Sequence, residues 1–184
     1  MIAFLVVLAL VAAILLWGIL IYNGLVRMRN MVQEAWSGID VQLKRRTDLI
    51  PNLVSTVKGY AAHEKGTLEE VIRLRGVAQN AQGVGETAQA QGLLGAALGR
   101  LFALAENYPD LKANANFAQL QASLGEIEDE VQLSRRYYNG AVRNLNIAVE
   151  SFPSNLIAGR FGFEKAEFFE LESPSERAVP KVEF

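Results

Sequence analysis

The sequence contains no cysteine and only one histidine, His63. The absence of cysteine excludes disulfides and thiolate metal sites. His63 has neither the second histidine of a zinc helix nor a glutamate three residues before it, which a dinuclear carboxylate site would need. It also lacks a sequence-level partner for nucleophilic catalysis. We therefore predict that the protein is not an enzyme and holds no metal or cofactor, with His63 facing solvent or capping a helix.

A surplus of basic residues is missing as well. The chain has 18 Lys and Arg against 20 Asp and Glu, which gives a net charge of −2. Non-specific binding to nucleic acid depends on a dense basic surface. The charge balance therefore predicts that nucleic acid is not a partner.

The beginning of the chain has no charged side chain at all. None precedes Arg27, and residues 2–22 are almost entirely apolar. The hydrocarbon core of a bilayer is about 30 Å thick and needs roughly 20 apolar helical residues to cross it. This stretch predicts a single transmembrane helix, with the lipid bilayer as a partner. A cleavable signal peptide is the alternative, but its apolar region would be shorter and would follow basic residues.

The residues at the end of this span predict its orientation. Arg27 and Arg29 follow the span, whereas nothing basic precedes it, so the positive-inside rule places the C-terminal domain in the cytoplasm. Trp17 and Tyr22 occupy the same end and are expected to anchor it at the membrane interface, although Trp17 could equally be a plain lipid contact.

After the span, apolar residues recur at steps of three and four, which is typical of one helix face. Only Asn23-Gly24 interrupts the pattern, so we predict one continuous helix from Ile2 to about Asp48. Pro51 should kink or break this helix, because proline lacks an N–H and its ring clashes with the preceding turn. The spacing then resumes in phase as far as Ala78, which favours a kink or a brief break over a reversal of the chain.

Two further helices are predicted beyond a loop. The segment Asn80–Gly92 is small and polar and is expected to be a loop and hinge. A helix should cover Leu93–Tyr108 and end at Pro109, and a stronger one should cover Phe117–Phe152 and stop at Pro153. The stronger helix keeps its apolar spacing over five heptads, as helices of a coiled-coil-like bundle do.

The predicted fold class is therefore all-α, with an N-terminal transmembrane helix continuous with an antiparallel long-helix bundle of the four-helix type. The predicted bundle core consists of Trp36, Ile39, Leu43, Ile50, Val57, Leu101, Phe117, Leu120, Leu124, Ile127, Val131, Tyr138 and Leu145.

The segment after Pro153 is too aromatic for a disordered tail. It carries Phe161, Phe163, Phe168 and Phe169, which should dock either on their own bundle or on a neighbouring subunit. The residues after Glu172 look mobile. The chain is thus expected to comprise an anchor at 1–24, a bundle domain at 25–153, and a docking segment with a mobile end at 154–184.

Polar residues of the predicted helices are expected to serve structure. The basic run 44–46 could be a lipid-binding patch, but Lys44 would lie about 33 Å beyond Tyr22 on a straight helix. We therefore favour pairing with Asp40 and Asp48 within or between bundles. Tyrosines and asparagines of the strong helix, including Tyr138 and Asn146, are expected to fix helix register rather than to bind a ligand.

Separated stretches of the sequence resemble the LemA family. In chain order they are YNGLVRMRNMVQEAWSGIDVQLKRRTDLIPNLVSTVKGYAAHE, AENYPDLKANANFAQLQ, RRYYNGAVRNLNIAVESFPSNLIAGRFGF and EFFEL. The resemblance covers Tyr22 to about Leu171. It implies a single N-terminal anchor, a bundle of long helices and a bacterial inner-membrane location. It implies no reaction, because the family has no agreed biochemical activity.

Two hypotheses about function follow. In the first, the protein is a structural scaffold: the anchor gathers copies in the membrane plane, and the bundles self-associate into a homo-oligomer that shapes the membrane or organises partners. In the second, it is an adaptor or signalling accessory that presents its bundle to another membrane protein, such as a protease or chaperone system.

Overall fold

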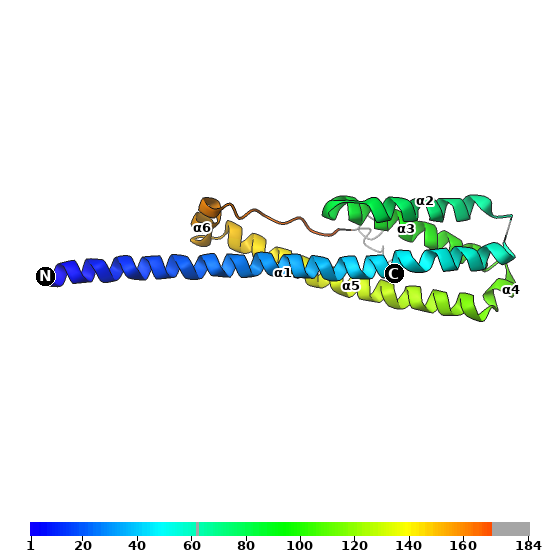
Figure 1. Cartoon of the computed structure of the whole chain (residues 1–184), viewed down its shortest axis with the longest axis horizontal. Coiled ribbons are helices and arrows are strands. Elements are labelled where there is room, and N and C mark those ends of the chain that lie inside the picture. Colours follow the sequence, from blue (N-terminus) through cyan, green and yellow to red (C-terminus); the bar gives the residue numbers. More distant parts are fainter. Residues whose placement is uncertain (62, 171–184) are drawn as a thin grey trace, which may run out of the picture. The chain divides into compact units, whose positions relative to one another are not determined.

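The computed structural model of the chain describes residues 1–61 and 63–170. Figure 1 shows its helices, which are α1 (Ile2–Tyr60), α2 (Lys65–Asn80), α3 (Gly83–Ala105), α4 (Pro109–Lys112), α5 (Ala115–Glu150) and α6 (Ser154–Phe161). No strand occurs in the described part of the chain. The prediction of an all-α fold with a long apolar N-terminal helix is confirmed. The predicted mobile end after Glu172 lies outside the described residues.

Helix α1 is longer than the sequence predicts. It continues through Pro51 to Tyr60, so the prediction that it ends near Asp48 is wrong. Proline is tolerated inside a helix only where the carbonyl that loses its N–H partner finds another donor. Here that carbonyl belongs to Thr47, and it accepts a hydrogen bond from the side chain of Arg75 on α2.

The predicted in-phase continuation as far as Ala78 is also wrong, because the chain reverses between α1 and α2 (Figure 1). The N–H of Ala61 still donates to the carbonyl of Val57, and the N–H of Glu64 then closes the turn on the carbonyl of Ala61 at 3.1 Å. The sequence gives no sign of this reversal. Both helices turn an apolar face to the same core, and the residues between them include no proline.

The predicted loop at Asn80–Gly92 is mostly helix. Helix α3 begins at Gly83, and the connection from α2 is only two residues long. The segment does have a buried face, made of small or polar side chains such as Ala88, Ala90 and Gln91. The third helix therefore starts ten residues earlier than Leu93, and it ends at Ala105, while Pro109 begins the short helix α4.

The described residues divide into two compact units, which share α1 and α5. The bundle unit contains residues 39–135 together with 168–170, and the anchor unit contains residues 1–38 and 136–167. The expected segment boundaries after residues 24 and 153 stay predictions.

In the bundle unit, parts of α1, α2, α3 and α5 pack antiparallel around one apolar core, with α4 closing one end (Figure 1). Its most completely buried side chains include Ile50, Leu53, Val57, Val71, Leu94, Leu101 and Leu111. Asn114 caps α5, since its Oδ1 accepts the N–H of Phe117 at 3.0 Å, and its Nδ2 donates to the Tyr60 hydroxyl at 2.9 Å.

Most of the residues that the sequence placed in the core are buried. Trp36 and Leu120 are half-buried, and the others are buried: Ile39, Leu43, Ile50, Val57, Leu101, Phe117, Leu124, Ile127, Val131, Tyr138 and Leu145.

In the anchor unit, α6 and the chain that follows it pack on α1 and α5. Leu25 of α1 lies in one apolar cluster with Ala158 and Phe163, and Ile157 packs against it. The rings of Trp36 and Tyr138 lie 5.5 Å apart. This packing places α6 beside the last turns of the predicted membrane span.

Candidate functional site

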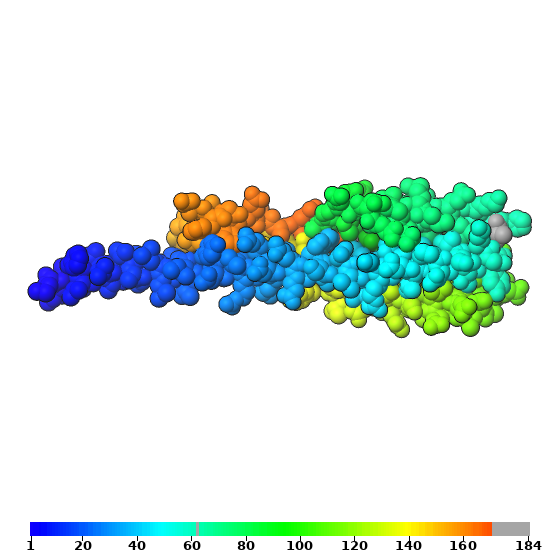
Figure 2. Space-filling view, in the orientation of Figure 1, coloured from blue at the N-terminus to red at the C-terminus, as the bar shows by residue number. Residues whose placement is uncertain are grey.

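The N-terminal part of α1 is an apolar helix that no other part of the described chain covers. Its 18-residue window of mean hydropathy 3.1 has no buried residue, and its large apolar side chains from Ile2 to Leu20 are between 48% and 80% exposed (Figure 2). A core helix of a soluble protein would bury these side chains. Burying them in a bilayer is worth about 25 cal/mol for each Å² removed from water, so this helix anchors the protein in a membrane.

The residues predicted to mark the membrane interface differ in their surroundings. Trp17 is 48% exposed and Arg27 is also exposed. Tyr22 makes edge-on contacts with Phe161 and Phe163, with ring centroids 4.9 and 5.6 Å apart. The guanidinium carbon of Arg29 lies 5.1 Å from the Phe163 ring centroid, within the range of a cation–π contact.

Helix α6 ends in a way that turns the chain back along the unit. Gly162 has φ +69°, in the left-handed region where glycine carries no steric penalty. The N–H of Phe163 donates to the carbonyl of Ala158 at 3.0 Å. As a result the Phe163 side chain folds inward and is buried next to Ala158.

The extended chain after α6 is held by polar side chains of α5. The Tyr138 hydroxyl donates to the Glu167 carbonyl at 2.8 Å. The amide of Asn146 bonds both backbone groups of Ala166, donating to its carbonyl at 3.0 Å and accepting its N–H at 2.8 Å. Burial raises the pKa of Tyr138, and the negative charge of Glu167 raises it further. These contacts hold the docking segment in a fixed register on α5.

The four phenylalanines of this segment fall into two groups. Phe163 and Phe169 are buried, at 6% and 1% exposure, whereas Phe161 is 57% exposed and Phe168 is 36% exposed. The first pair is therefore covered by its own chain. Only Phe161 and Phe168 offer much apolar surface to a neighbour or to lipid.

The anchor unit also has an open apolar groove of about 420 Å³. Gly24, Met28 and Met31 of α1 line one side, and Ala141, Ile147 and Ala148 of α5 line the other. Ile147 is 55% exposed, and Tyr137 on the same helix is also 55% exposed. Tyr137, Asn144 and Ile147 follow one another at steps of seven and three residues, so they share one face of α5.

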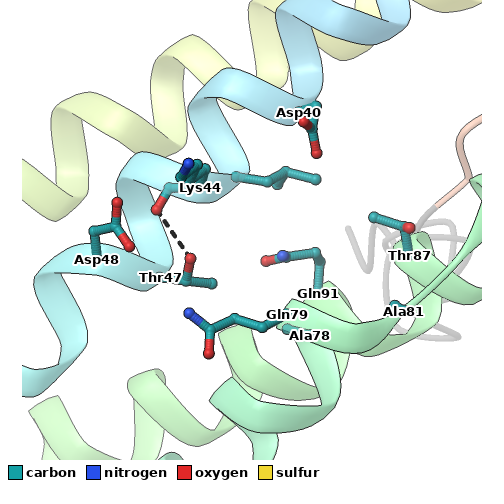
Figure 3. Close-up of a pocket in the computed structure, with 10 residues that line it drawn as sticks. Asp40, Lys44, Thr47, Asp48, Ala78, Gln79, Ala81, Thr87 and Gln91 are labelled. Carbon is teal, nitrogen blue, oxygen red and sulfur yellow. Dashed lines mark hydrogen bonds between the residues drawn. The ribbon is translucent and has the colours of Figure 1, made fainter.

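The bundle unit contains a polar cavity of about 240 Å³ that the sequence does not reveal (Figure 3). Thr47 of α1 and Thr87 and Gln91 of α3 are buried around it, and the Gln91 Oε1 has no hydrogen-bond partner. Asp40, Lys44 and Asp48 stand on the α1 side of the cavity. One pattern in the sequence could have indicated this cavity. Thr87, Gln91 and Leu94 follow one another at steps of four and three residues, so the two polar side chains share the buried face of α3 with Leu94.

Two side chains of the basic run at residues 44–46, those of Arg45 and Arg46, have partners within the bundle unit, and these partners are not the predicted acids. Arg46 pairs with Glu128 of α5 at 3.2 Å, and its side chain is only 11% exposed. Arg45 donates to Gln42 on its own helix at 2.9 Å. The expectation of pairing inside the bundle holds for Arg46, whereas Asp40 and Asp48 are not its partners.

His63 is exposed in the turn between α1 and α2. Within residues 1–61 and 63–170, no three or more His, Asp or Glu side chains are grouped so that they could hold a metal ion.

The sequence of the chain is similar to those of several known proteins. The chain is 31% identical to magnetosome protein MamQ 2 of Paramagnetospirillum magneticum over 183 aligned positions, which cover 84% of this chain and 66% of the relative. It is 28% identical to magnetosome protein MamQ of Magnetospirillum gryphiswaldense, over 80% of this chain and 64% of that protein. It is 27% identical to protein LemA of Metamycoplasma hominis, over 80% of this chain and 68% of that protein.

The chain thus spans slightly less than two thirds of the length of the MamQ relatives it matches. The family profile described as the LemA family matches residues 35–184. These residues include the whole bundle unit and the whole docking segment. The protein therefore belongs to the LemA family.

Proposed function

We propose that the protein is a structural scaffold of the bacterial inner membrane, anchored by the first part of α1 and self-associating in the membrane plane. Its bundle unit would lie in the cytoplasm, since Arg27 and Arg29 follow the span. The membrane-anchoring helix and the membership of the LemA family support a membrane role.

One observation carries the self-association. The groove of the anchor unit and the exposed Ile147 lie directly after the span, on residues 24–31 of α1 and the facing part of α5. Copies held in one bilayer in one orientation present this region at the same height. Small residues such as Gly24 and Ala141 let a neighbouring helix approach closely, and Met28 and Met31 can adapt their shape to it. The occupant of the groove is therefore a second copy of this chain.

An array of such copies would impose its own geometry on the membrane that holds the anchors. The names of the MamQ relatives assign those proteins to the magnetosome. By analogy, the shaping or organisation of a membrane compartment is the role that fits a scaffold of this kind.

A charge placed in the groove tests the self-association. Ile147→Glu should reduce the full-length protein in mild detergent from large assemblies to small species, as measured by mass photometry. Ile72→Glu is the matched control, because Ile72 is equally apolar and 53% exposed but lies on α2 of the bundle unit. Assemblies of unchanged size in Ile147→Glu would contradict the proposed interface.

The rival role is an adaptor for another membrane protein. It predicts that the wild-type protein itself is a monomer or dimer in mass photometry. Cross-linking from a photoreactive residue at position 147 in cells would then yield adducts with a second protein rather than with another copy.

The topology is tested by labelling in intact cells. The natural chain has no cysteine, so Ile72→Cys carries the only thiol. A membrane-impermeant maleimide should leave it unlabelled until the membrane is opened. Efficient labelling of intact cells would place the bundle unit on the outside.

A further inference from the structure

Helix α6 leaves its largest apolar side chains uncovered. Phe152, just before the helix, is 79% exposed, Leu156 is 63% exposed, and Phe161 is 57% exposed. Phe152 lies before the first turn of α6, and within the helix Leu156 lies one turn before the exposed Arg160. The buried residues Ala158 and Phe163 face α1 instead. The contacts with α1 thus leave three large apolar side chains exposed at and next to α6, and a second apolar surface could cover them.

The position of α6 relative to the membrane span follows from contacts within the anchor unit. The Cδ1 of Ile157 lies 3.8 Å from the position that a Cβ on Gly18 would occupy. Phe161 contacts Tyr22, at the end of the apolar stretch. Gly18 precedes Tyr22 by four residues, or about 6 Å along a helix. Helix α6 therefore lies level with the last turn of the span and with the residues directly after it, including Leu25.

We propose that α6 is an interfacial helix that inserts Phe152, Leu156 and Phe161 into the leaflet where the span ends. Amphipathic segments of this kind lie about 5–10 Å deep at the boundary between headgroups and acyl chains. That depth matches the level of Gly18 to Tyr22. The occupant of the exposed face of α6 is thus the lipid bilayer itself.

The charges around α6 fit an interfacial location. Arg160 at its end is exposed, as are Arg27 and Arg29 just beyond the span. Basic side chains near a membrane surface gain about 1 kcal/mol each from anionic headgroups. A helix this short would not be stable in isolation, so its packing on Leu25 and Gly18 is what preforms it for insertion.

This inference rests on the membrane anchor and not on self-association. It adds a second contact with the bilayer at a defined depth. A wedge of three large side chains in one leaflet also gives a scaffold a direct way to act on membrane curvature.

A fluorescent probe in α6 tests the proposal in the full-length protein. Leu156→Cys, labelled with the environment-sensitive dye NBD, is reconstituted into vesicles of phosphatidylcholine and phosphatidylglycerol. Ile72→Cys is the matched control, and Phe152→Cys repeats the measurement at a second site. The expected result is a blue-shifted emission at positions 156 and 152, quenched by a lipid that carries a nitroxide near the headgroup. The probe at position 72 should show neither effect.

Two results would overturn the proposal. One is emission at positions 156 and 152 that matches position 72, with no quenching by the lipid nitroxide. The other is a blue shift that disappears when the protein is diluted to about one copy per vesicle, because a second copy rather than lipid would then cover α6. A shift that persists at this dilution supports insertion even if mass photometry shows that the wild-type protein does not self-associate.

Discussion

The Nε of Arg75 donates a hydrogen bond of 2.9 Å to the carbonyl oxygen of Thr47. This is the carbonyl that the residue four positions later in α1 would normally satisfy, and that residue is Pro51, which has no N–H. A side chain of α2 thus completes the hydrogen bonding of α1. The same contact ties the two helices together about 20 Å along α1 from the turn that follows Tyr60.

Replacing Arg75 by Met should therefore destabilise the bundle by about 1–3 kcal/mol, the usual cost of leaving a buried polar group unpaired. Pro51→Ala restores an N–H for the Thr47 carbonyl, so in that background the same substitution should cost about 1 kcal/mol less. Chemical denaturation of the four variants gives the coupling directly. Equal costs in both backgrounds would mean that Arg75 does not substitute for the missing N–H.

Glu128→Gln should also destabilise the bundle by about 1–3 kcal/mol. It leaves the guanidinium of Arg46, 11% exposed, without its counter-charge, and burial already lowers the pKa of Arg46. Glu70→Gln is the control, since the exposed Glu70–Arg73 pair should contribute little. Glu128→Gln should unfold at a lower urea concentration than Glu70→Gln. Similar urea midpoints would mean that Arg46 is as well solvated as a surface residue.

Gln91→Leu should stabilise the bundle by about 1 kcal/mol. The Gln91 Oε1 is buried without a partner, and an apolar side chain of similar size removes that cost. Thermal unfolding of wild type and variant makes the comparison. A lower melting temperature in the variant would instead show that a water molecule or a ligand occupies the cavity and bonds Gln91.

Leu124→Asp should unfold the bundle unit. Leu124 is 6% exposed in the apolar core, and an unpaired carboxylate there costs several kcal/mol, comparable with the whole stability of a domain. Leu133→Asp on the same helix is the control, because Leu133 is 55% exposed. Circular dichroism should show loss of helix only in the first variant, and normal melting of Leu124→Asp would place this seam outside the core.

Tyr138 should make the stability of the docked segment depend on alkaline pH. Burial raises its pKa above the ordinary value of about 10, so the folded state favours the neutral phenol that donates to Glu167. This contribution is fully present below pH 10 and is lost as the pH rises through the raised pKa. The difference in melting temperature between wild type and Tyr138→Phe should therefore shrink above pH 10. A difference that does not change with pH would contradict the role of the phenolic hydrogen.

The strongest helices could be predicted from the sequence because large apolar residues mark their buried faces. Leu124, Ile127, Val131 and Leu145 give α5 within two residues at each end. The first ten residues of α3 could not be predicted, because large apolar residues are absent from their buried face. That face is made of Thr87, alanines and Gln91, which carry no hydrophobic signal although they keep the helical step.

Two features could not be predicted without the three-dimensional structure. They are the turn between α1 and α2 and the position at which the last described segment docks. Periodicity records which face of a helix is buried, and it does not record the direction of the chain. The contacts of Asn146 with Ala166 join residues 20 positions apart through one side chain and one backbone unit. A single contact of this kind leaves no repeating pattern in the sequence. The aromatic residues therefore predict that the segment docks, but they do not predict where.

The short connection between α2 and α3 bears on how the bundle unit forms. The two helices are joined by Ala81 and Gln82 alone, so their shared interface involves residues close in sequence. Interfaces of low contact order form quickly, because little chain entropy is lost in closing them. During synthesis the α2–α3 hairpin can assemble before α5 has been translated, on a chain whose apolar N-terminal helix has already emerged.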